Sequence, residues 1–350
     1  MNTFGHTLRL TTAGESHGPA LCAILDGMPS GVAADFDSLR VAMQRRAPGG
    51  AFGSPRREPD EVEILSGIYQ GHTTGAPIAF IIRNTDARSH DYDDIAQVYR
   101  PSHADYTYAA RYGHTDPRGG GGSSARETAL RVAAGAIADW ALSARGIHCI
   151  AYTRQIGNIV ADCNYVYESD VWHNPIYCTD ADAADKMCRL LKETAACGDT
   201  VGGIVGGIIT GMPAGVGNPV YGKLHAHLGA AMLSINAAHG FDYGMGFDGC
   251  CGFGSDLNDP FIPDQDGGIT LASNNSGGIQ GGISNGMPIT FRVGFKPIPT
   301  LGRPQNTVNR SGLSTQLQPR GRHDVCALPR AVPVVQAMAR LAALDALLTT

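Results

Sequence analysis

The chain has 350 residues, of which 43% are hydrophobic, so it is long enough to bury a substantial core. A formal net charge of -5 at pH 7 argues against a dedicated nucleic-acid binder, whose surface would be basic. We expect no membrane span and no signal peptide, because the chain has no run of about 18 apolar residues and no apolar N-terminal stretch. The scattered cysteines lack CxxC spacing, which favours free thiols in a reducing cytoplasm over a zinc site.

In chain order, the first predicted elements are strands at residues 62–65 and 78–82, followed by a helix at residues 125–144. The helix carries apolar residues at helical spacing. Ser124 and Glu127 form a predicted capping box at its start, and Gly146 follows its end.

The second half of the chain predicts strands at residues 204–210 and 289–295 and a helix at residues 334–348. The strand at 289–295 alternates, which places on one face Ile289, Phe291, Val293 and Phe295. Strands and helices mix without strict β-α-β alternation, so the predicted fold class is α+β. No linker divides the chain, and we therefore expect one domain over residues 1–350.

An internal repeat is predicted from two similar segments. Residues 67–80 (GIYQGHTTGAPIAF) and 278–291 (GIQGGISNGMPITF) share glycine, isoleucine, proline and phenylalanine at a constant offset. Each resembles a glycine-turned hairpin that enters a strand. Chance similarity in a glycine-rich chain is the alternative.

Two histidines lie in segments suited to proton transfer. His17 follows Ser16 in the sequence GESHG, where flanking glycines let the backbone approach a ligand closely. His103 lies between Arg100 and Asp105, so charges of both signs can tune its pKa. Each histidine can exchange a proton near neutral pH. Either segment alone is also compatible with a histidine that is held in a structural turn.

A glycine-rich segment at residues 118–128 (RGGGGSSARET) is a candidate anion site. It runs into a capped helix start, where free N–H groups and the helix dipole favour negative charge. It is not a P-loop, because no GK[ST] follows, and its glycine spacing differs from a Rossmann turn. A flexible loop before a helix is the alternative.

Further charged segments lie towards the C-terminus. Lys296 and Thr300, in the sequence KPIPT, offer an ammonium and a hydroxyl that suit a phosphate. Arg322 and Asp324, in GRHD, can face one site if the backbone there is extended. A surface salt-bridge cluster is the alternative for GRHD.

An arginine cluster lies near the N-terminus, with a solvated face as its alternative interpretation: Arg45, Arg46, Arg56 and Arg57. Taken together, the charged segments predict an enzyme that acts on an anionic, phosphorylated small molecule. Neither a flavin nor an elimination reaction follows from these residues alone.

These segments, in this order, resemble the chorismate synthase family over residues 4–347. The matching blocks are GESHGPALCAILDGMP, RPSHADYTY, SSARET, SINA, GGIQGGISNG, KPIPT and GRHD. The resemblance implies a β-α-β sandwich with internal duplication and a homotetramer. It also implies a lyase that converts 5-enolpyruvylshikimate 3-phosphate to chorismate and phosphate by 1,4-elimination, on the route to aromatic amino acids.

The resemblance further implies a requirement for reduced FMN, which lends an electron transiently while the reaction has no net redox change. NADPH is the reductant if the protein reduces its own flavin. By the same resemblance, His17 protonates the departing phosphate and His103 protonates or steadies the flavin. Ser16 with Asp324 relays the proton that leaves the ring.

Ligand contacts are also implied by the matching motifs. Flavin contacts are implied for Ser123, Ser124, Asn236, Ala237, Gly281, Lys296, Pro297, Ile298, Pro299, Thr300 and Arg322. Substrate or NADP contacts are implied for Arg46, Arg56, Arg100 and Arg126. Lys296 and Thr300 would hold the FMN phosphate, and no metal ligand is implied.

The sequence departs from the family pattern at several charged positions. Ala47 and Gly122 stand where arginine is usual, residues 51–53 lack an expected basic residue, and Gln336 replaces a glutamate. Each charge-assisted hydrogen bond is worth about 1.5–3 kcal/mol, so the lost cations predict weaker binding of a trianion.

Three other functions compete with an active lyase. One is a degenerate family member that keeps the fold and the flavin but has weak or no activity, because of Ala47 and Gly122. Another is a flavin reductase that uses NADPH. A metal hydrolase is disfavoured, since the histidines lack ligand spacing beyond His225 and His227.

Overall fold

Alternating apolar residues give the strands of this protein one buried face. The computed structural model describes residues 2–47, 59–85, 97–116, 118–163, 166–265, 267–317 and 324–350. In β16 (Ile289–Phe295) the four apolar residues of the predicted face are buried and the residues between them are partly exposed, which confirms the alternation. The predicted strands at 62–65, 78–82 and 204–210 are also confirmed, within one residue at each end.

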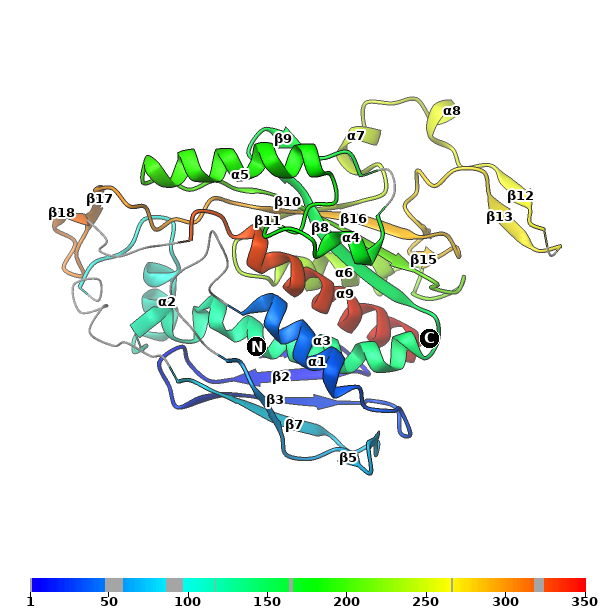
Figure 1. Cartoon of the computed structure of the whole chain (residues 1–350), viewed down its shortest axis with the longest axis horizontal. Coiled ribbons are helices and arrows are strands. Elements are labelled where there is room, and N and C mark those ends of the chain that lie inside the picture. The colour runs from blue at the N-terminus through cyan, green and yellow to red at the C-terminus, as the bar shows by residue number, and fades with distance from the viewer. Residues whose placement is uncertain are drawn as a thin grey trace.

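Two antiparallel five-stranded sheets form the outer layers of the molecule (Figure 1). The first contains, in order, β1 (Thr3–Phe4), β2 (Arg9–Ala13), β3 (Ala20–Asp26), β7 (Ile78–Arg83) and β4 (Val62–Ile64). The second contains, in order, β9 (Ile159–Val160), β8 (His148–Ile156), β10 (Gly203–Thr210), β16 and β11 (Ala238–Tyr243).

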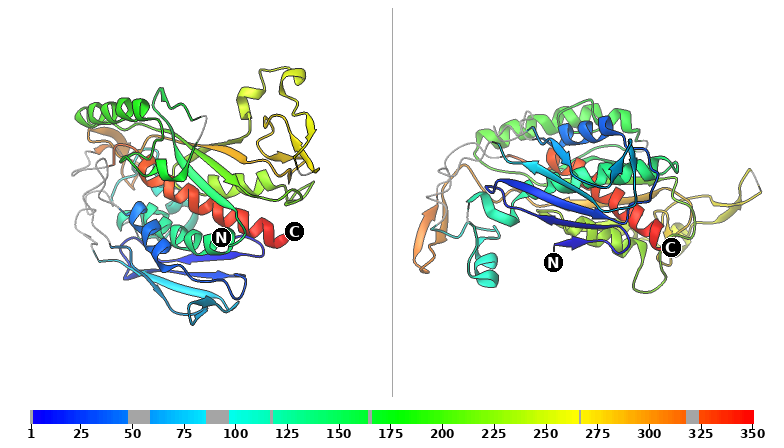
Figure 2. Two further views of the ribbon diagram at one scale, coloured as in Figure 1. Left: turned by 45° about the vertical axis from the view of Figure 1, so that its right-hand side comes forward. Right: turned by 90° about the horizontal axis from the view of Figure 1, so that it is seen from below.

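A layer of helices fills the space between the sheets, as Figures 1 and 2 show. Its members are α1 (Phe36–Arg46), α3 (Thr128–Ser143), α6 (Leu224–Leu233) and α9 (Leu328–Thr349). Within this layer α3 packs most extensively against α9, and α9 also packs on β8 and β10. The α+β class is therefore confirmed, with helices sandwiched between two sheets. Outside this sandwich, α5 (Ala181–Ala196) lies against β9.

The predicted helix at residues 125–144 begins with a short 3-10 turn, η3 (Ala125–Glu127), and continues as α3. Ser124 caps the turn, since its side chain accepts a hydrogen bond from the N–H of Arg126. The Glu127 side chain instead binds Arg131, at 2.6 Å, so the structure shows the Ser124 half of the predicted capping box. Gly146 ends the helix with a φ of +69°, as a glycine after a helix commonly does.

The C-terminal helix α9 begins six residues before the predicted start at residue 334. Pro329 lies in its first turn, where a missing N–H costs nothing, but Pro333 lies inside the helix. Burial of nearly the whole helix offsets that lost hydrogen bond. By length and composition α9 could cross a membrane, with a mean hydropathy of 1.5, but 78% of that window is buried inside the protein. It is the core helix of this fold.

The two similar glycine-rich segments adopt the same structure. Each forms a two-stranded hairpin ahead of a central strand: β5 (Ile68–Tyr69) with β6 (His72–Thr73), and β14 (Ile279–Gln280) with β15 (Ile283–Ser284). Thr73 donates a hydrogen bond to the carbonyl of Pro29 at 2.6 Å, and Ser284 donates one to the carbonyl of Pro213 at 2.6 Å. In each half the same hydroxyl accepts a backbone N–H from three residues beyond that proline.

The second half carries an insertion that the first half lacks. Between β11 and β14 the chain forms α7 (Gly246–Gly249), α8 (Gly254–Leu257), β12 (Phe261–Pro263) and β13 (Ile269–Leu271). Figure 1 shows this arm projecting from the body, whereas β4 and β5 are joined by three residues. The remaining short elements are α2 (Asp105–Tyr112), η2 (Arg118–Ser123), α4 (Glu168–Val171), β17 (Gln305–Val308) and β18 (Ser314–Leu317).

The crossing of α3 and α9 predicts one sensitive glycine. A Cβ at Gly135 would lie 2.5 Å from the Cα and Cβ of Ala337, so the two helix backbones would have to separate. We expect Gly135→Ala to lower the free energy of unfolding by about 1–3 kcal/mol despite its better helix propensity. Thermal unfolding followed by circular dichroism would measure the change.

Gly254→Ala is the matched control, because a Cβ at Gly254 meets no atom within 4 Å. We expect its midpoint to stay close to that of the native protein. A Gly135→Ala protein as stable as the native one would show that the helices do not depend on this close approach.

Candidate active site

The largest concentration of predicted site residues lies at the N-terminal ends of α3 and α9. A cavity of about 430 Å³ opens there, and both helix starts line it: Ser124, Ala125 and Thr128 from one, and Ala327, Arg330, Ala331 and Val334 from the other. Unpaired N–H groups and the helix dipole give each helix start a partial positive charge. Two such ends at one cavity favour a bound anion.

Two loops that follow secondary-structure elements complete the wall of this large cavity. One follows α6 and contributes Asn236 and Ala237, while the other follows β16 and contributes Lys296 and Thr300. A backbone hydrogen bond joins the two loops, because the Lys296 N–H donates to the Ala237 carbonyl at 3.0 Å. The Asn236 side chain donates to the Ser123 carbonyl at 3.0 Å, which ties the wall to the glycine-rich segment.

Most of the residues with implied flavin contacts are thus brought together by the fold. Those that line the large cavity are Ser123, Ser124, Asn236, Ala237, Lys296, Ile298, Pro299 and Thr300. Pro297 lies between two lining residues, and Gly281 lies elsewhere, at the β14–β15 turn. Arg322 lies outside the described residues.

Strained backbone marks the same wall. Ala237 and Ser102, both of which line the large cavity, have positive φ angles of +64° and +57°. A positive φ at a residue other than glycine costs on the order of 1–3 kcal/mol of conformational free energy, and it persists only where surrounding contacts hold the backbone in place. Here Lys296 supplies one such contact, since its Nζ donates to the Ser102 carbonyl at 2.9 Å.

His103 lies in the wall beside three charged groups. Burial lowers the pKa of His103 to about 4, and the nearby cations of Arg100 and Lys296 lower it further while Asp105 opposes them. The imidazole is therefore neutral at pH 7 in the protein alone. Because the unfolded chain binds this proton between pH 4 and about 6.5, His103 makes the fold more stable as pH rises through that window.

Asp324 also lines the large cavity and is held by a cation from α9. The Arg330 Nη1 lies 2.9 Å from an Asp324 carboxylate oxygen, and the Asp324 side chain is 16% exposed. The pair places a carboxylate at the opening between the helix starts and the Lys296 loop.

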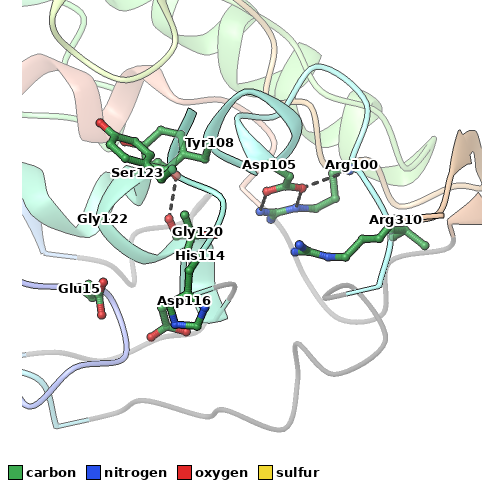
Figure 3. Close-up of a pocket in the computed structure, with 13 residues that line it drawn as sticks. Glu15, Arg100, Asp105, Tyr108, His114, Asp116, Gly120, Gly122, Ser123 and Arg310 are labelled. Carbon is green, nitrogen blue, oxygen red and sulfur yellow. Dashed lines mark hydrogen bonds and ion pairs between the residues drawn. The ribbon is translucent and has the colours of Figure 1, made fainter. Parts of the chain in front are cut away.

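A second cavity, of about 240 Å³, adjoins the first and shares with it Arg100, Gly120 and Ser123. Figure 3 shows its lining residues. Arg100 forms two hydrogen bonds to Asp105, at 2.7 and 2.6 Å, which lower the pKa of that carboxyl against the effect of burial. Glu15 and Asp116 lie at the other end of this small cavity.

The loop that carries His17 joins β2 to β3 and is pinned from two sides. The Ser16 N–H donates to the Gly121 carbonyl at 3.3 Å, and the Asn84 amide donates to the carbonyls of Glu15 and Gly18. Ser16 is buried under this contact. His17 does not line either cavity, although its neighbour Glu15 lines the small one.

Asp116 connects His17 to the small cavity electrostatically. Hydrogen bonds from Arg118 lower the pKa of Asp116, burial opposes this, and the imidazole of His17 makes a further, smaller contribution. His17 therefore lies within electrostatic range of a carboxylate that lines the cavity.

Arg46 and Arg126, which the sequence suggested as ligand contacts, face the protein interior. Both guanidinium groups bind the buried Asp60, with Arg46 Nη1 at 2.6 Å from its carboxylate. Arg126 also donates to Asn84 at 3.0 Å, and Asn84 in turn donates to the His17 loop, so the buried network supports that loop. Burial, with the nearby Arg330 cation, lowers the pKa of Arg46 to about 10. Arg56 lies outside the described residues.

Sequence reasoning missed Asp60, Asn84 and Arg330. Nothing in the local sequence marks the first two, because their partners come from distant segments. Arg330 carried a usable signal, since a cation in the first turn of a helix opposes the helix dipole and needs a nearby anion.

The departures from the family pattern fall at different places. Gly122 lines the small cavity, and a Cβ there would meet no atom within 4 Å. Ala47 ends α1. Gln336 is buried and donates to the Cys149 carbonyl at 2.8 Å, away from both cavities. Residues 51–53 lie outside the described residues.

Comparison with known proteins agrees with this geometry. The family model "Chorismate synthase" matches residues 8–348. Chorismate synthases of Porphyromonas gingivalis and Bacteroides fragilis are each 51% identical, covering 100% and 98% of this chain and 96% and 97% of their own lengths. A crystal structure of chorismate synthase superposes with a TM-score of 0.75 at 29% identity, covering 99% of this chain and 93% of its own. The chain therefore belongs to the chorismate synthase family and is an enzyme that forms chorismate.

Proposed function

We propose that this enzyme converts 5-enolpyruvylshikimate 3-phosphate to chorismate and phosphate with reduced FMN bound in the large cavity. The observation that carries the proposal is the convergence of two helix N-termini and Lys296 on one cavity whose wall also contains His103 and Asp324. The lining of this cavity offers both hydrogen-bond donors for a phosphate and apolar side chains for a flat ring system. The volume of about 430 Å³ lies in the usual range for a cofactor site.

The residues present fit FMN. Lys296 and the Thr300 hydroxyl offer charge-assisted and neutral hydrogen bonds to a phosphate, and the helix starts add backbone donors. Ile298, Ala331 and Val334 offer apolar contacts for a ring. When bound, the reduced flavin supplies the electron density that assists cleavage of the carbon–oxygen bond.

We assign the substrate to the small cavity, because it adjoins the large one through Arg100, Gly120 and Ser123. His17 lines neither cavity but interacts electrostatically with Asp116, which lines the small one, and we assign to His17 the protonation of the departing phosphate. The cavity walls orient the substrate between His17 and the flavin site.

His103 and Asp324 are assigned the remaining proton steps. His103 is neutral in the protein alone, so a proton-donor role needs a bound anion that raises its pKa. Asp324, fixed by Arg330, is assigned with Ser16 to receive the proton that leaves the ring. Replacement of His103 or Asp324 should therefore lower kcat more than it weakens binding of the substrate.

The degenerate alternative finds no support, since full-length relatives named chorismate synthase are about half identical to this chain. We propose NADPH only as a source of electrons for the flavin. A cytoplasmic location fits the free cysteines, and a homotetramer remains the expected assembly.

The lyase assignment predicts chorismate formation under anaerobic conditions from 5-enolpyruvylshikimate 3-phosphate and reduced FMN. We expect His17→Ala to lower kcat by about 10²–10⁴-fold, the usual contribution of a general acid. Chorismate absorbance would report the rate. His72→Ala is the control, because His72 is exposed on β6 and lines neither cavity. Absence of chorismate with the native protein would contradict the assignment.

The His103 assignment predicts a cofactor-linked pKa. Oxidised FMN should raise the pKa of His103 from about 4, because its phosphate offsets the cations of Arg100 and Lys296. Riboflavin lacks the phosphate and should leave the pKa low. Titration of the imidazole carbon by NMR, assigned with His103→Gln, would measure both values. If His103 had the same pKa with FMN and with riboflavin, the phosphate would not bind near His103 and the assignment would be wrong.

A further inference from the structure

The loop between β2 and β3 contains a four-residue turn with His17 at its third position. The Gly18 N–H donates to the Glu15 carbonyl at 3.1 Å, which closes the turn. Gly14 brings the two ends of the loop together, because its φ is +114° and a Cβ there would lie 2.7 Å from the Ala20 carbonyl oxygen. The direction in which the His17 side chain leaves the backbone therefore depends on how this turn is held.

Asn84 holds both ends of the turn with three hydrogen bonds. Its side-chain amide donates to the Glu15 carbonyl at 3.1 Å and to the Gly18 carbonyl at 2.8 Å. Its backbone N–H donates to the Pro19 carbonyl at 3.2 Å. Because Asn84 directly follows β7, which lies between β3 and β4, these bonds fix the turn to the first sheet.

A buried ion pair sets the orientation of the Asn84 amide. The Arg126 Nε donates to the amide oxygen at 3.0 Å, so the amide nitrogen faces the turn. Arg126 is itself held by the carboxylate of Asp60, whose side chain is fully buried. Asp60 has a φ of +50°, a strained conformation that persists because surrounding contacts hold it. A reversed amide would place its oxygen against two carbonyl oxygens and its N–H groups against a guanidinium.

We propose that Asn84 is a positioning residue for His17, and that its amide sets the turn from which His17 protonates the departing phosphate. The proposal rests on the role proposed above for His17, and Asn84 lies outside every sequence block that resembles the family. A displacement of about 1 Å in a catalytic group can lower a rate about 100-fold. Loss of the Asn84 amide should therefore act on kcat.

Asn84→Asp tests the proposal because it keeps the side-chain size and the acceptor for Arg126 but replaces the donor with a second oxygen. We expect kcat for chorismate formation to fall about 10- to 100-fold, with little change in KM or in the affinity for FMN. Asn84→Ala removes the same donor without adding a charge and should lower kcat to a similar extent. An unchanged kcat in both variants would overturn the proposal.

Asn174→Asp is the matched control for the loss of a structural amide. The Asn174 amide also donates to a backbone carbonyl, that of Cys178 at 2.5 Å, and its oxygen accepts backbone N–H groups. Asn174 lines neither the large nor the small cavity. We expect this variant to keep the kcat of the native enzyme.

A double-mutant cycle separates positioning of His17 from a general loss of structure. In the His17→Ala protein, Asn84→Asp should lower kcat no further, because its effect on the native enzyme passes through the missing imidazole. An equal fold-change in kcat with and without His17 would overturn the proposal.

Hydrogen exchange of the Gly18 N–H gives a readout that is independent of turnover. Asn84→Asp should lower the protection of this amide about tenfold, as the loss of a hydrogen bond predicts, while the amides of β3 stay protected. If the native protein formed no chorismate, this result would still support the hold of Asn84 on the turn and would count against the lyase function alone. Unchanged protection of Gly18 would overturn the proposal.

Discussion

The close crossing of α3 and α9 is the constraint on which the rest of the structure depends. The two helices approach so closely that a Cβ at Gly135 would lie 2.5 Å from the Cα and Cβ of Ala337. Each helix is the core helix of one half of the chain, and each supports its own sheet. Because both begin at the same end of the sandwich, their N-termini converge on the large cavity. The packing that joins the two halves thus also forms the candidate anion site.

The two halves share an architecture but contribute different chemistry. The matching hairpins, with Thr73 and Ser284 in equivalent roles, stabilise the ends of the sheets. Catalytic candidates come instead from segments that differ between the halves, such as the His17 loop, the Lys296 loop and the start of α9. The buried Asp60 supports the first of these segments indirectly. It binds Arg46 and Arg126, Arg126 donates to Asn84, and the Asn84 amide donates to the His17 loop.

The sequence predicted the elements with regular patterns and missed long-range polar partners. Alternation placed β16 within its observed bounds, and the glycine pattern identified both hairpins. Helix α9 begins six residues before its predicted start, and burial of nearly the whole helix stabilises it across Pro333. Eight of the residues for which the resemblance implies flavin contacts line one cavity, whereas Arg46, for which it implies a substrate or NADP contact, binds Asp60 in the interior. Such roles depend on residues far apart in sequence, so no local pattern shows them.

The central claim is that the large cavity recognises the phosphate of a flavin nucleotide. Quenching of flavin fluorescence, titrated with the native protein and with Lys296→Met, tests it most directly. The native protein should bind FMN about 10- to 100-fold more tightly than riboflavin, and Lys296→Met should lose most of that preference. Equal affinity of the native protein for FMN and riboflavin would contradict the claim.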